Sequence, residues 1–391
     1  MMGNQLFQLA ALIGHAARQT PQSVTPPPHS VKRPRLHGRN SLASLPPLQV
    51  VVPDIRWTGR EQERQRVFEL LELDVACVPL DFLKVRVQDI YQERHYHYDP
   101  KIVEVGCGVG GEAEEGGASC NLDLLGRFQS FWYFAHAEEE VRRRMRIRES
   151  VLRRARAVVE HVRASFRDSC ALSASSVSGG GCREGSCRRD VRVVSLHVRR
   201  GDNVPHERAG IYQDWRNEAP HLYGQPGDTQ APHLLLSTDY IDRAAARIEH
   251  ADWCGDAGCV YLVFADTARD IQWCKDNIPP RLRYRFFSEF VPLVSTWVKG
   301  AMVQGTGKRV AALTDVLDLA GIASCDAHII STSSFSWWGA YLNDRKDKKV
   351  IVPTPWFNPD HPMGREANTD TMHPPDWELL SLLNTTLSHG H

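Results

Sequence analysis

The C-terminal half of the chain alternates strand-like runs of β-branched and apolar residues with segments of helical periodicity. This alternation limits the possible folds more than any other feature of the sequence. In chain order, the runs and segments lie at 191–198, 239–250, 260–265, 270–278, 315–324, 327–331, 336–343 and 350–353. Alternation favours βαβ units, in which a crossover helix joins two parallel strands. We therefore predict an α/β fold with a doubly wound parallel sheet, a type of sheet that binds ligands at the carboxyl ends of its strands.

The N-terminal part of the sequence has a different texture. Residues 1–18 have the pattern of an amphipathic helix. Residues 138–166 carry apolar side chains at helical spacing among many arginines, which predicts one long amphipathic helix. Between these two segments, seven prolines fall within residues 20–47, so we expect an exposed insert there.

Residues 171–190 are a mixture of Ser, Gly, Cys and Arg without a hydrophobic period. Such composition is typical of a low-complexity linker or insert. It divides the chain into a predicted N-terminal domain at 1–170 and a predicted C-terminal domain at 191–391.

Charge and composition exclude several classes of function. Lys plus Arg and Asp plus Glu each number 47, and this zero net charge disfavours a nucleic-acid-binding surface driven by excess positive charge. The sequence has no run of about 18 apolar residues, so we expect no segment of it to span a bilayer. The cysteine pairs Cys182/Cys187 and Cys254/Cys259 lack the partner spacing of a zinc ribbon, and no metal site is predicted.

The first polar motif, His-Val-Arg-Arg-Gly-Asp, runs from His197 to Asp202 at the end of a predicted strand. The guanidinium groups of Arg199 and Arg200 stay charged and present a planar fork suited to phosphate oxygens. Asp202 can pair with one arginine or cap the following segment. The alternative is that both arginines are solvated and that Arg-Gly-Asp is a chance tripeptide or an adhesion signal.

The second polar motif, at residues 331–340, places four hydroxyl residues between a predicted strand and a predicted helix. Hydroxyls and free amides at a helix N-terminus make a seat for an anion. The alternative is N-capping by one of the serines, which accounts for a single hydroxyl. Together the two motifs describe a site for a nucleotide diphosphate, whose charge Arg199 neutralises.

These motifs resemble the two strongest signatures of the α-1,2-fucosyltransferase family (galactoside 2-alpha-L-fucosyltransferases, of the glycosyltransferase family 11 type). Weaker resemblances follow in the order that the family shows, at Gly3–Gln8, Gly126–Ser130, Val263–Asp266, Trp273–Lys275 and Asp318–Cys325. The resemblance implies a GT-B fold, in which two Rossmann-like domains face a cleft and the C-terminal domain holds GDP-fucose. It also implies inverting transfer of L-fucose from this donor to the 2-hydroxyl of a galactose-type acceptor on a glycan, with no required metal or cofactor.

The resemblance further implies a strand ahead of Gly3, which this sequence lacks, and we expect the first strand of the N-terminal domain to be missing. Eukaryotic members are Golgi proteins held in the membrane by an N-terminal tether, whereas bacterial members are cytoplasmic. No tether is visible in this sequence.

Candidate roles follow from the chemistry and the resemblance together. Arg199 stabilises the leaving diphosphate, and Asp202, with Glu207 as the alternative, is the candidate general base. Arg200 binds substrate or braces its loop through Asp202 or Asp266. The other candidate substrate-binding residues are Asn4, Gln5, His197, Asp266, Asp318, Ser333, Ser334, Phe335, Ser336 and Trp337, with Asn4 and Gln5 expected on a loop.

Two alternatives to a fucosyltransferase remain open. One is a catalytically inactive relative that binds a glycan or a nucleotide without turnover. The other, a more distant one, is an adhesion protein that displays Arg-Gly-Asp. The acceptor glycan is not encoded in any motif that we recognise.

Overall fold

The computed structural model describes residues 2–19, 51–54, 67, 69–73, 76–79, 89–93, 97–103, 122–175, 191–200, 233–250, 253–254, 258–290 and 308–383. The predicted Pro-rich insert at 20–47 and residues 176–190 of the predicted linker lie outside these ranges. The predicted division into two domains remains a prediction.

A six-stranded sheet forms the centre of the C-terminal part, in the order β12-β11-β10-β7-β8-β9. Every neighbouring pair in this sheet is parallel. The strands are β7 (Arg192–Val198), β8 (Cys259–Ala265), β9 (Tyr284–Phe286), β10 (Ala327–Ile329), β11 (Val350–Thr354) and β12 (Glu378–Ser381). The predicted α/β class and the parallel sheet in the C-terminal region are therefore confirmed.

Within the described ranges, five helices lie between these strands, and three of them begin at a side-chain cap formed by Ser or Thr. The five helices are α8 (Thr238–Glu249), α9 (Ala268–Asn277), α12 (Lys308–Ser324), α13 (Ser334–Tyr341) and α14 (Pro362–Glu366). The hydroxyls of Ser237, Thr267 and Ser333 accept hydrogen bonds from the first turns of α8, α9 and α13. Such caps satisfy amides that have no partner inside the helix, which explains why these starts could be predicted.

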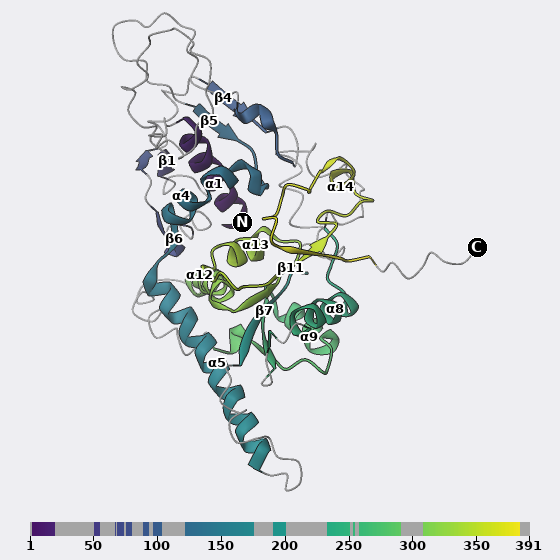
Figure 1. Ribbon diagram of the computed structural model, residues 1–391. Helices are drawn as coiled ribbons and strands as arrows, with labels where there is room; N and C mark the ends of the chain where they lie inside the picture. The colour runs from purple at the N-terminus through teal and green to yellow at the C-terminus, as the bar shows by residue number, and fades with distance from the viewer. Residues whose placement is uncertain are drawn as a thin grey trace, which may run out of the picture.

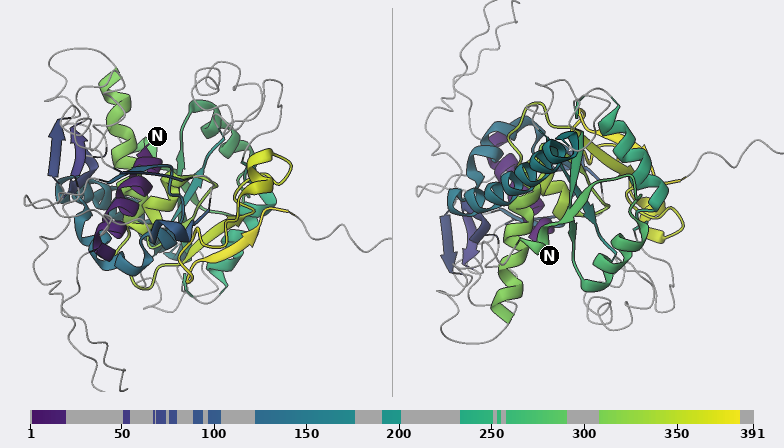
Figure 2. Two further views of the ribbon diagram at one scale, coloured as in Figure 1. Left: turned by 90° about the horizontal axis from the view of Figure 1, so that it is seen from above. Right: turned by 90° about the horizontal axis from the view of Figure 1, so that it is seen from below.

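The two faces of the sheet are covered by different helices (Figure 2). Val194 and Leu196 of β7 pack in one apolar cluster with α8 and α9. The alternate residue Val193 packs with residues of α5 (Glu149–Ser175) and α12 on the opposite face. This alternation with period two follows from the pleat of a strand, and burial on both faces explains the continuous apolar runs of the strands.

The chain reverses its direction of winding between β7 and β10. From β7 it proceeds outward to β8 and β9, and it then returns to place β10 on the other side of β7. In open α/β sheets, ligands bind outside the carboxyl ends of the strands at such a switch point. A ligand site is therefore expected at the carboxyl ends of β7 and β10.

The described N-terminal elements form smaller pairings (Figure 1). β1 and β3 are parallel, β4 and β5 are parallel, and β2 and β6 are antiparallel. The elements are α1 (Met2–Gln19), β1 (Val51–Asp54), β2 (Leu71–Leu73), β3 (Ala76–Pro79), β4 (Asp89–Gln92), η2 (Pro100–Val103), β5 (Leu122–Leu125), η3 (Phe131–Tyr133), η4 (Ala135–Ala137), α4 (Glu138–Arg144) and β6 (Met145–Ile147).

The prediction of one uninterrupted helix over 138–166 was wrong. Helix α4 ends at Arg144, residues Met145–Ile147 form β6, and α5 begins at Glu149 and continues to Ser175. The break occurs because β6 pairs with Leu71–Leu73, which buries Met145 completely. A distant strand thus outweighs the local helical period.

Helix α1 packs directly on α13, and both contribute to one hydrophobic cluster that spans the N-terminal and C-terminal parts. The ring of Phe7 lies 4.6 Å from Trp337 and 5.2 Å from Trp338, between ring centroids. This packing brings the polar first turn of α1 beside the first turn of α13. None of the helices in the described ranges is both long and apolar enough to cross a membrane.

Candidate functional site

His197 joins the carboxyl ends of the two strands at the switch point. Its side chain is 2% exposed, and its Nδ1 lies 2.7 Å from the hydroxyl of Ser331, which follows β10. Burial is the main reason that the pKa of His197 falls to about 4, while the nearby Asp266 acts in the opposite direction and Arg199 lowers it further. At neutral pH this imidazole is uncharged and acts as a structural tie between the strands.

Arg199 and Asp266 supply the charge at this edge of the sheet. Arg199 leaves the end of β7 and Asp266 follows β8, and Arg199 Nη1 lies 3.6 Å from Asp266 Oδ2. The other oxygen of Asp266 lies 4.0 Å from His197 Nε2. The ion pair between Arg199 and Asp266 is long, and the Asp266 side chain is 42% exposed, so this pair by itself contributes little to stability.

Arg200 packs against an aromatic side chain. Its guanidinium stacks over the ring of Trp273 on α9, 4.2 Å from the ring centroid. Asp266, one of the two carboxylates predicted to brace Arg200, lies 3.6 Å from Arg199. Asp202, the other predicted brace and the first candidate base, lies outside the described residues, as does Glu207.

The hydroxyls of the second motif make hydrogen bonds within the protein, and their role in an anion seat remains a prediction. Ser333 Oγ caps α13 by accepting from Phe335 N at 3.3 Å. The remaining bonds are Thr332 Oγ1 to Leu234 O at 3.2 Å, Ser334 Oγ to Asn4 Oδ1 at 2.8 Å, and Ser336 Oγ to Ser333 O at 3.3 Å. The amides of Phe335 and Trp337 donate to Ser333. The donors that remain suited to an anion are the amides of Ser334 and Ser336, which have no acceptor among the described residues, and the hydroxyl of Ser333, whose oxygen only accepts there.

Phe335 and Trp337 occupy different environments. Phe335 is half-buried, and its ring centroid lies 5.7 Å from that of His197, so it belongs to the site edge. Trp337 is fully buried and donates from Nε1 to His373 Nδ1 at 3.1 Å. The structure therefore places Trp337 in the core, where it supports α13 from behind.

Asn4 and Gln5 lie in the first turn and a half of α1, and the expectation that they occupy a loop was wrong. Asn4 Oδ1 accepts from Ser334 Oγ and also from Gln129 Nε2 at 2.6 Å. Gln5 Oε1 is buried and has no hydrogen-bond partner among the described residues.

Gln129 was not among the predicted site residues. It belongs to the segment Gly126–Ser130, whose resemblance to the family was noted without a role. Glu93 Oε2 accepts from the amides of Arg127 and Phe128 at 2.7 and 2.8 Å, which fixes the turn that carries Gln129. The contact with Asn4 could not be found from sequence, because it joins residues 125 positions apart.

Asp318 lies on α12, in a partly enclosed position on the side of the site where Asp266 stands. Burial, together with the negative charges of Asp315 and Asp266, raises the pKa of Asp318 well above its ordinary value. This carboxyl therefore favours its protonated form. Within the described ranges, no cluster of three or more His, Cys, Asp or Glu side chains could hold a metal ion.

The family model for glycosyl transferase family 11 matches residues 239–378. These residues run from α8 to the first residue of β12 and include Asp266, Asp318 and the serine motif. Over these residues the chain is similar to glycosyl transferase family 11. This match supports the family resemblance that the motifs indicate.

Two curated relatives from Escherichia coli share this similarity. An alpha-1,2-colitosyltransferase is 31% identical over 169 residues, which are 43% of this chain and 42% of the relative. The O-antigen biosynthesis glycosyltransferase WbnK is 26% identical over 168 residues, which are 43% of this chain and 40% of the relative. The similarity thus spans well under half the length of either relative.

Among solved structures, the fucosyltransferase NodZ from Bradyrhizobium aligns with 86% of this chain and 88% of that chain. The sequence identity is 11% and the TM-score is 0.33. A score at this level carries no argument about the site.

Proposed function

We propose that this protein is an inverting glycosyltransferase that transfers L-fucose from GDP-fucose to the 2-hydroxyl of a galactose-type acceptor on a glycan. The observation that carries the proposal is the meeting of two anion-binding elements at the switch point of the sheet. Arg199 leaves β7, the start of α13 follows β10, and the contact between His197 and Ser331 joins the two strands. The names of the two relatives support transfer of a sugar.

The proposed chemistry centres on the leaving group. When the bond between fucose and GDP breaks, the sugar gains oxocarbenium character and the diphosphate gains negative charge. Donors that already point at this charge stabilise the transition state. Arg199 provides a permanent positive charge, and the first-turn amides of α13 provide donors at the positive end of a helix dipole. The arrangement assigns this stabilisation to side chains and amides of the protein.

The acceptor hydroxyl must lose a proton as it attacks, and Asp202 remains the first candidate base, with Glu207 second. His197 and Arg200, which precede Asp202 in the chain, are fixed by Ser331 and Trp273. Asp318, whose pKa is raised by burial, and Asp266 are proposed contacts of the donor.

The test is a transfer assay with labelled GDP-fucose and a lactose-type acceptor. The expected product carries fucose on the galactose 2-hydroxyl, with inversion at the anomeric carbon. Because one relative is named a colitosyltransferase, a colitosyl donor is assayed in parallel. A preference for that donor would support the proposed site but with a different transferred sugar. GDP binding without turnover of either donor would favour the alternative, an inactive relative that binds a nucleotide.

A further inference from the structure

One side-chain oxygen connects three distant parts of the chain at the edge of the site. Asn4 Oδ1 accepts from Gln129 Nε2 at 2.6 Å and from Ser334 Oγ at 2.8 Å. Asn4 lies on α1, Gln129 precedes η3, and Ser334 is the first residue of α13. This acceptor therefore links two segments of the N-terminal part to the first residue of α13.

This arrangement decides what the Ser334 hydroxyl can do. A serine hydroxyl has one proton to donate. Ser334 donates it to Asn4, so that proton is not available to a phosphate oxygen. The backbones are also in contact, because a Cβ added at Gly3 would lie 2.6 Å from the carbonyl carbon of Ser334. The starts of α1 and α13 are thus tied by both side chain and backbone.

Gln129 is itself held rigidly. It is 9% exposed, and the preceding Phe128 has a φ of +52°, which is uncommon for a residue other than glycine. Such a backbone persists where its surroundings impose it. Here the Glu93 carboxylate accepts both preceding amides, and Tyr133 donates to its other oxygen at 3.0 Å.

We propose that Gln129, Asn4 and Ser334 act as positioning residues by which the N-terminal part fixes the first turn of α13. We call these three residues and the two hydrogen bonds that join them the relay. The relay rests on the proposed function, because the turn that it fixes carries the amides assigned to the donor diphosphate. Amides bind a charge most strongly when they are already oriented toward it. Loss of either hydrogen bond frees the turn and weakens binding of the diphosphate.

The test measures GDP binding by calorimetry on the full chain. Gln129→Leu, Asn4→Ala and Ser334→Ala are each expected to raise the Kd for GDP by about tenfold, which corresponds to the loss of about one hydrogen bond. The double variant Asn4→Ala/Ser334→Ala is expected to bind no more weakly than Asn4→Ala alone, because Asn4→Ala already removes the bond that Ser334→Ala removes. Additive losses would contradict the relay.

Gln8 provides a matched control. Its Nε2 donates to Gly126 O at 2.7 Å, so it also ties α1 to the segment Gly126–Ser130, but it has no contact with Ser334. Gln8→Leu is expected to keep the wild-type Kd. If Gln8→Leu weakens GDP binding as much as Gln129→Leu does, the effect is general loosening and the relay is wrong.

Hydrogen exchange of the amides in residues 334–337, measured without ligand, separates the relay from the donor assignment. Faster exchange in Gln129→Leu and Ser334→Ala, but not in Gln8→Leu, is expected. If exchange responds in this way but wild-type protein binds no GDP, the proposed donor is wrong and the relay stands. If exchange is unchanged in both variants, the relay is wrong whether or not GDP binds. Ser334→Ala, which removes one oxygen atom, keeps the test decisive should Gln129→Leu fail to fold.

Discussion

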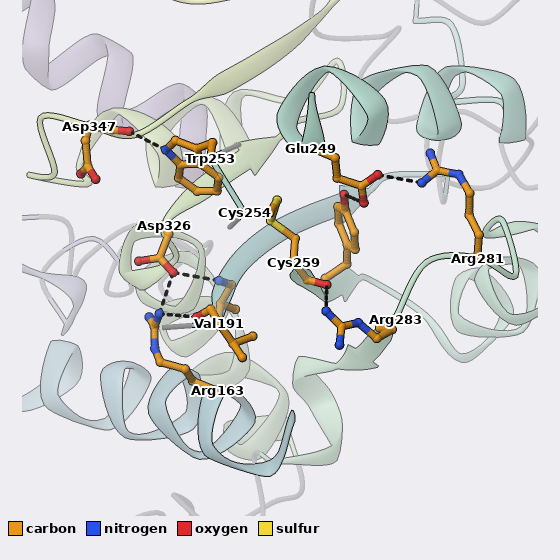
Figure 3. Close-up of a disulfide and its surroundings, with 12 residues drawn as sticks. Arg163, Val191, Glu249, Trp253, Cys254, Cys259, Arg281, Arg283, Asp326 and Asp347 are labelled. Carbon is orange, nitrogen blue, oxygen red and sulfur yellow. Dashed lines mark hydrogen bonds and ion pairs between the residues drawn. A yellow bond between two sulfur atoms is a disulfide. The ribbon is translucent and has the colours of Figure 1, made fainter. Parts of the chain in front are cut away.

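The two ends of the parallel strands use the same types of charged residue in different ways. The amino edge is the side of the sheet where the strands begin, and the carboxyl edge is the side where they end. At the amino edge, Asp326 is 2% exposed and lies 3.0 Å from Arg163 and 3.2 Å from Arg345. It also accepts from the amide of Val193 at 2.8 Å (Figure 3). At the carboxyl edge, Asp266 is 42% exposed and holds Arg199 at 3.6 Å.

The difference indicates that the charged residues at the amino edge stabilise the fold, whereas those at the carboxyl edge are suited to binding. An enclosed carboxylate with two cations and an amide has its charge fully compensated inside the protein, so it can contribute only to stability. The long ion pair between Arg199, which is 21% exposed, and the exposed Asp266 can be exchanged for contact with an anion at little cost to the fold. Each of the following predictions tests whether the two edges are divided in this way.

The largest expected effect is at the amino edge. Asp326→Ala leaves the charges of Arg163 and Arg345 without their shared partner, and removing one member of a buried ion pair costs about 3–5 kcal/mol. Urea unfolding monitored by circular dichroism measures this free energy. Asp347, which pairs with Arg345 at 2.9 Å but is 53% exposed, is the control, and Asp347→Ala is expected to cost less than about 1 kcal/mol. Equal costs would show that burial does not distinguish the two carboxylates.

The next effect is on turnover at the carboxyl edge. Arg199→Ala is expected to lower kcat by about 10²-fold, or about 2.7 kcal/mol of transition-state stabilisation, with little change in unfolding free energy. Steady-state transfer kinetics measure it. Arg192→Ala removes an arginine from the opposite end of the same strand and is expected to leave kcat unchanged. GDP release unaffected by Arg199→Ala would refute the mechanism.

A third prediction concerns the disulfide at the amino edge, between Cys254 and Cys259 (Figure 3). It closes the connection between α8 and β8, and replacing both cysteines by serine is expected to cost roughly 2 kcal/mol of unfolding free energy. GDP affinity, measured by calorimetry, is expected to stay at the wild-type value because the bond lies at the edge away from the site. A weaker Kd would show that the two edges are coupled.

The smallest effect is a change in pH dependence. Burial lowers the pKa of His197 to about 4 and that of His328 to about 3, both below the ordinary 6.5. Each neutral histidine therefore contributes stability that is present above pH 6.5 and is lost as the pH falls toward its folded pKa. The carboxyls of Glu93 and Asp318, whose pKa is raised by burial, act in the opposite direction.

His197→Gln and His328→Gln are each expected to reduce the slope of unfolding free energy against pH by about 1.4 kcal/mol per pH unit between pH 6 and 5. Urea titrations at several pH values give these slopes. Only the change at His197, at the carboxyl edge, is expected to alter GDP binding as well. An unchanged slope in both variants would mean that neither histidine is held neutral by the fold.

Much of the C-terminal fold could be predicted because its signals are local. The apolar run at 260–265 and the cap at Thr267 each lie within one element or its first turn. Predicting that Arg199 and the serine motif meet needed only one further rule, that parallel strands place their carboxyl ends at the same edge. The structure brings these two motifs together at β7 and β10.

The partners of the polar groups could not be predicted in the same way. No sequence pattern distinguishes Arg199 from Arg200. In the structure, Arg199 faces Asp266, whereas Arg200 stacks on Trp273. The break at Met145 depends on a strand more than seventy residues earlier in the chain. Local patterns contain no information about either contact.

The sequence by itself determined most strands and helices of the C-terminal region and which strand ends carry cations and hydroxyls, because backbone preferences and burial periodicity act over a few neighbouring residues. Only the tertiary structure decided where each proton and charge is directed. Ser334 has a single hydroxyl proton, and the oxygen that accepts it lies 330 positions away. That choice depends on how α1 packs against α13, a contact set by the shared core.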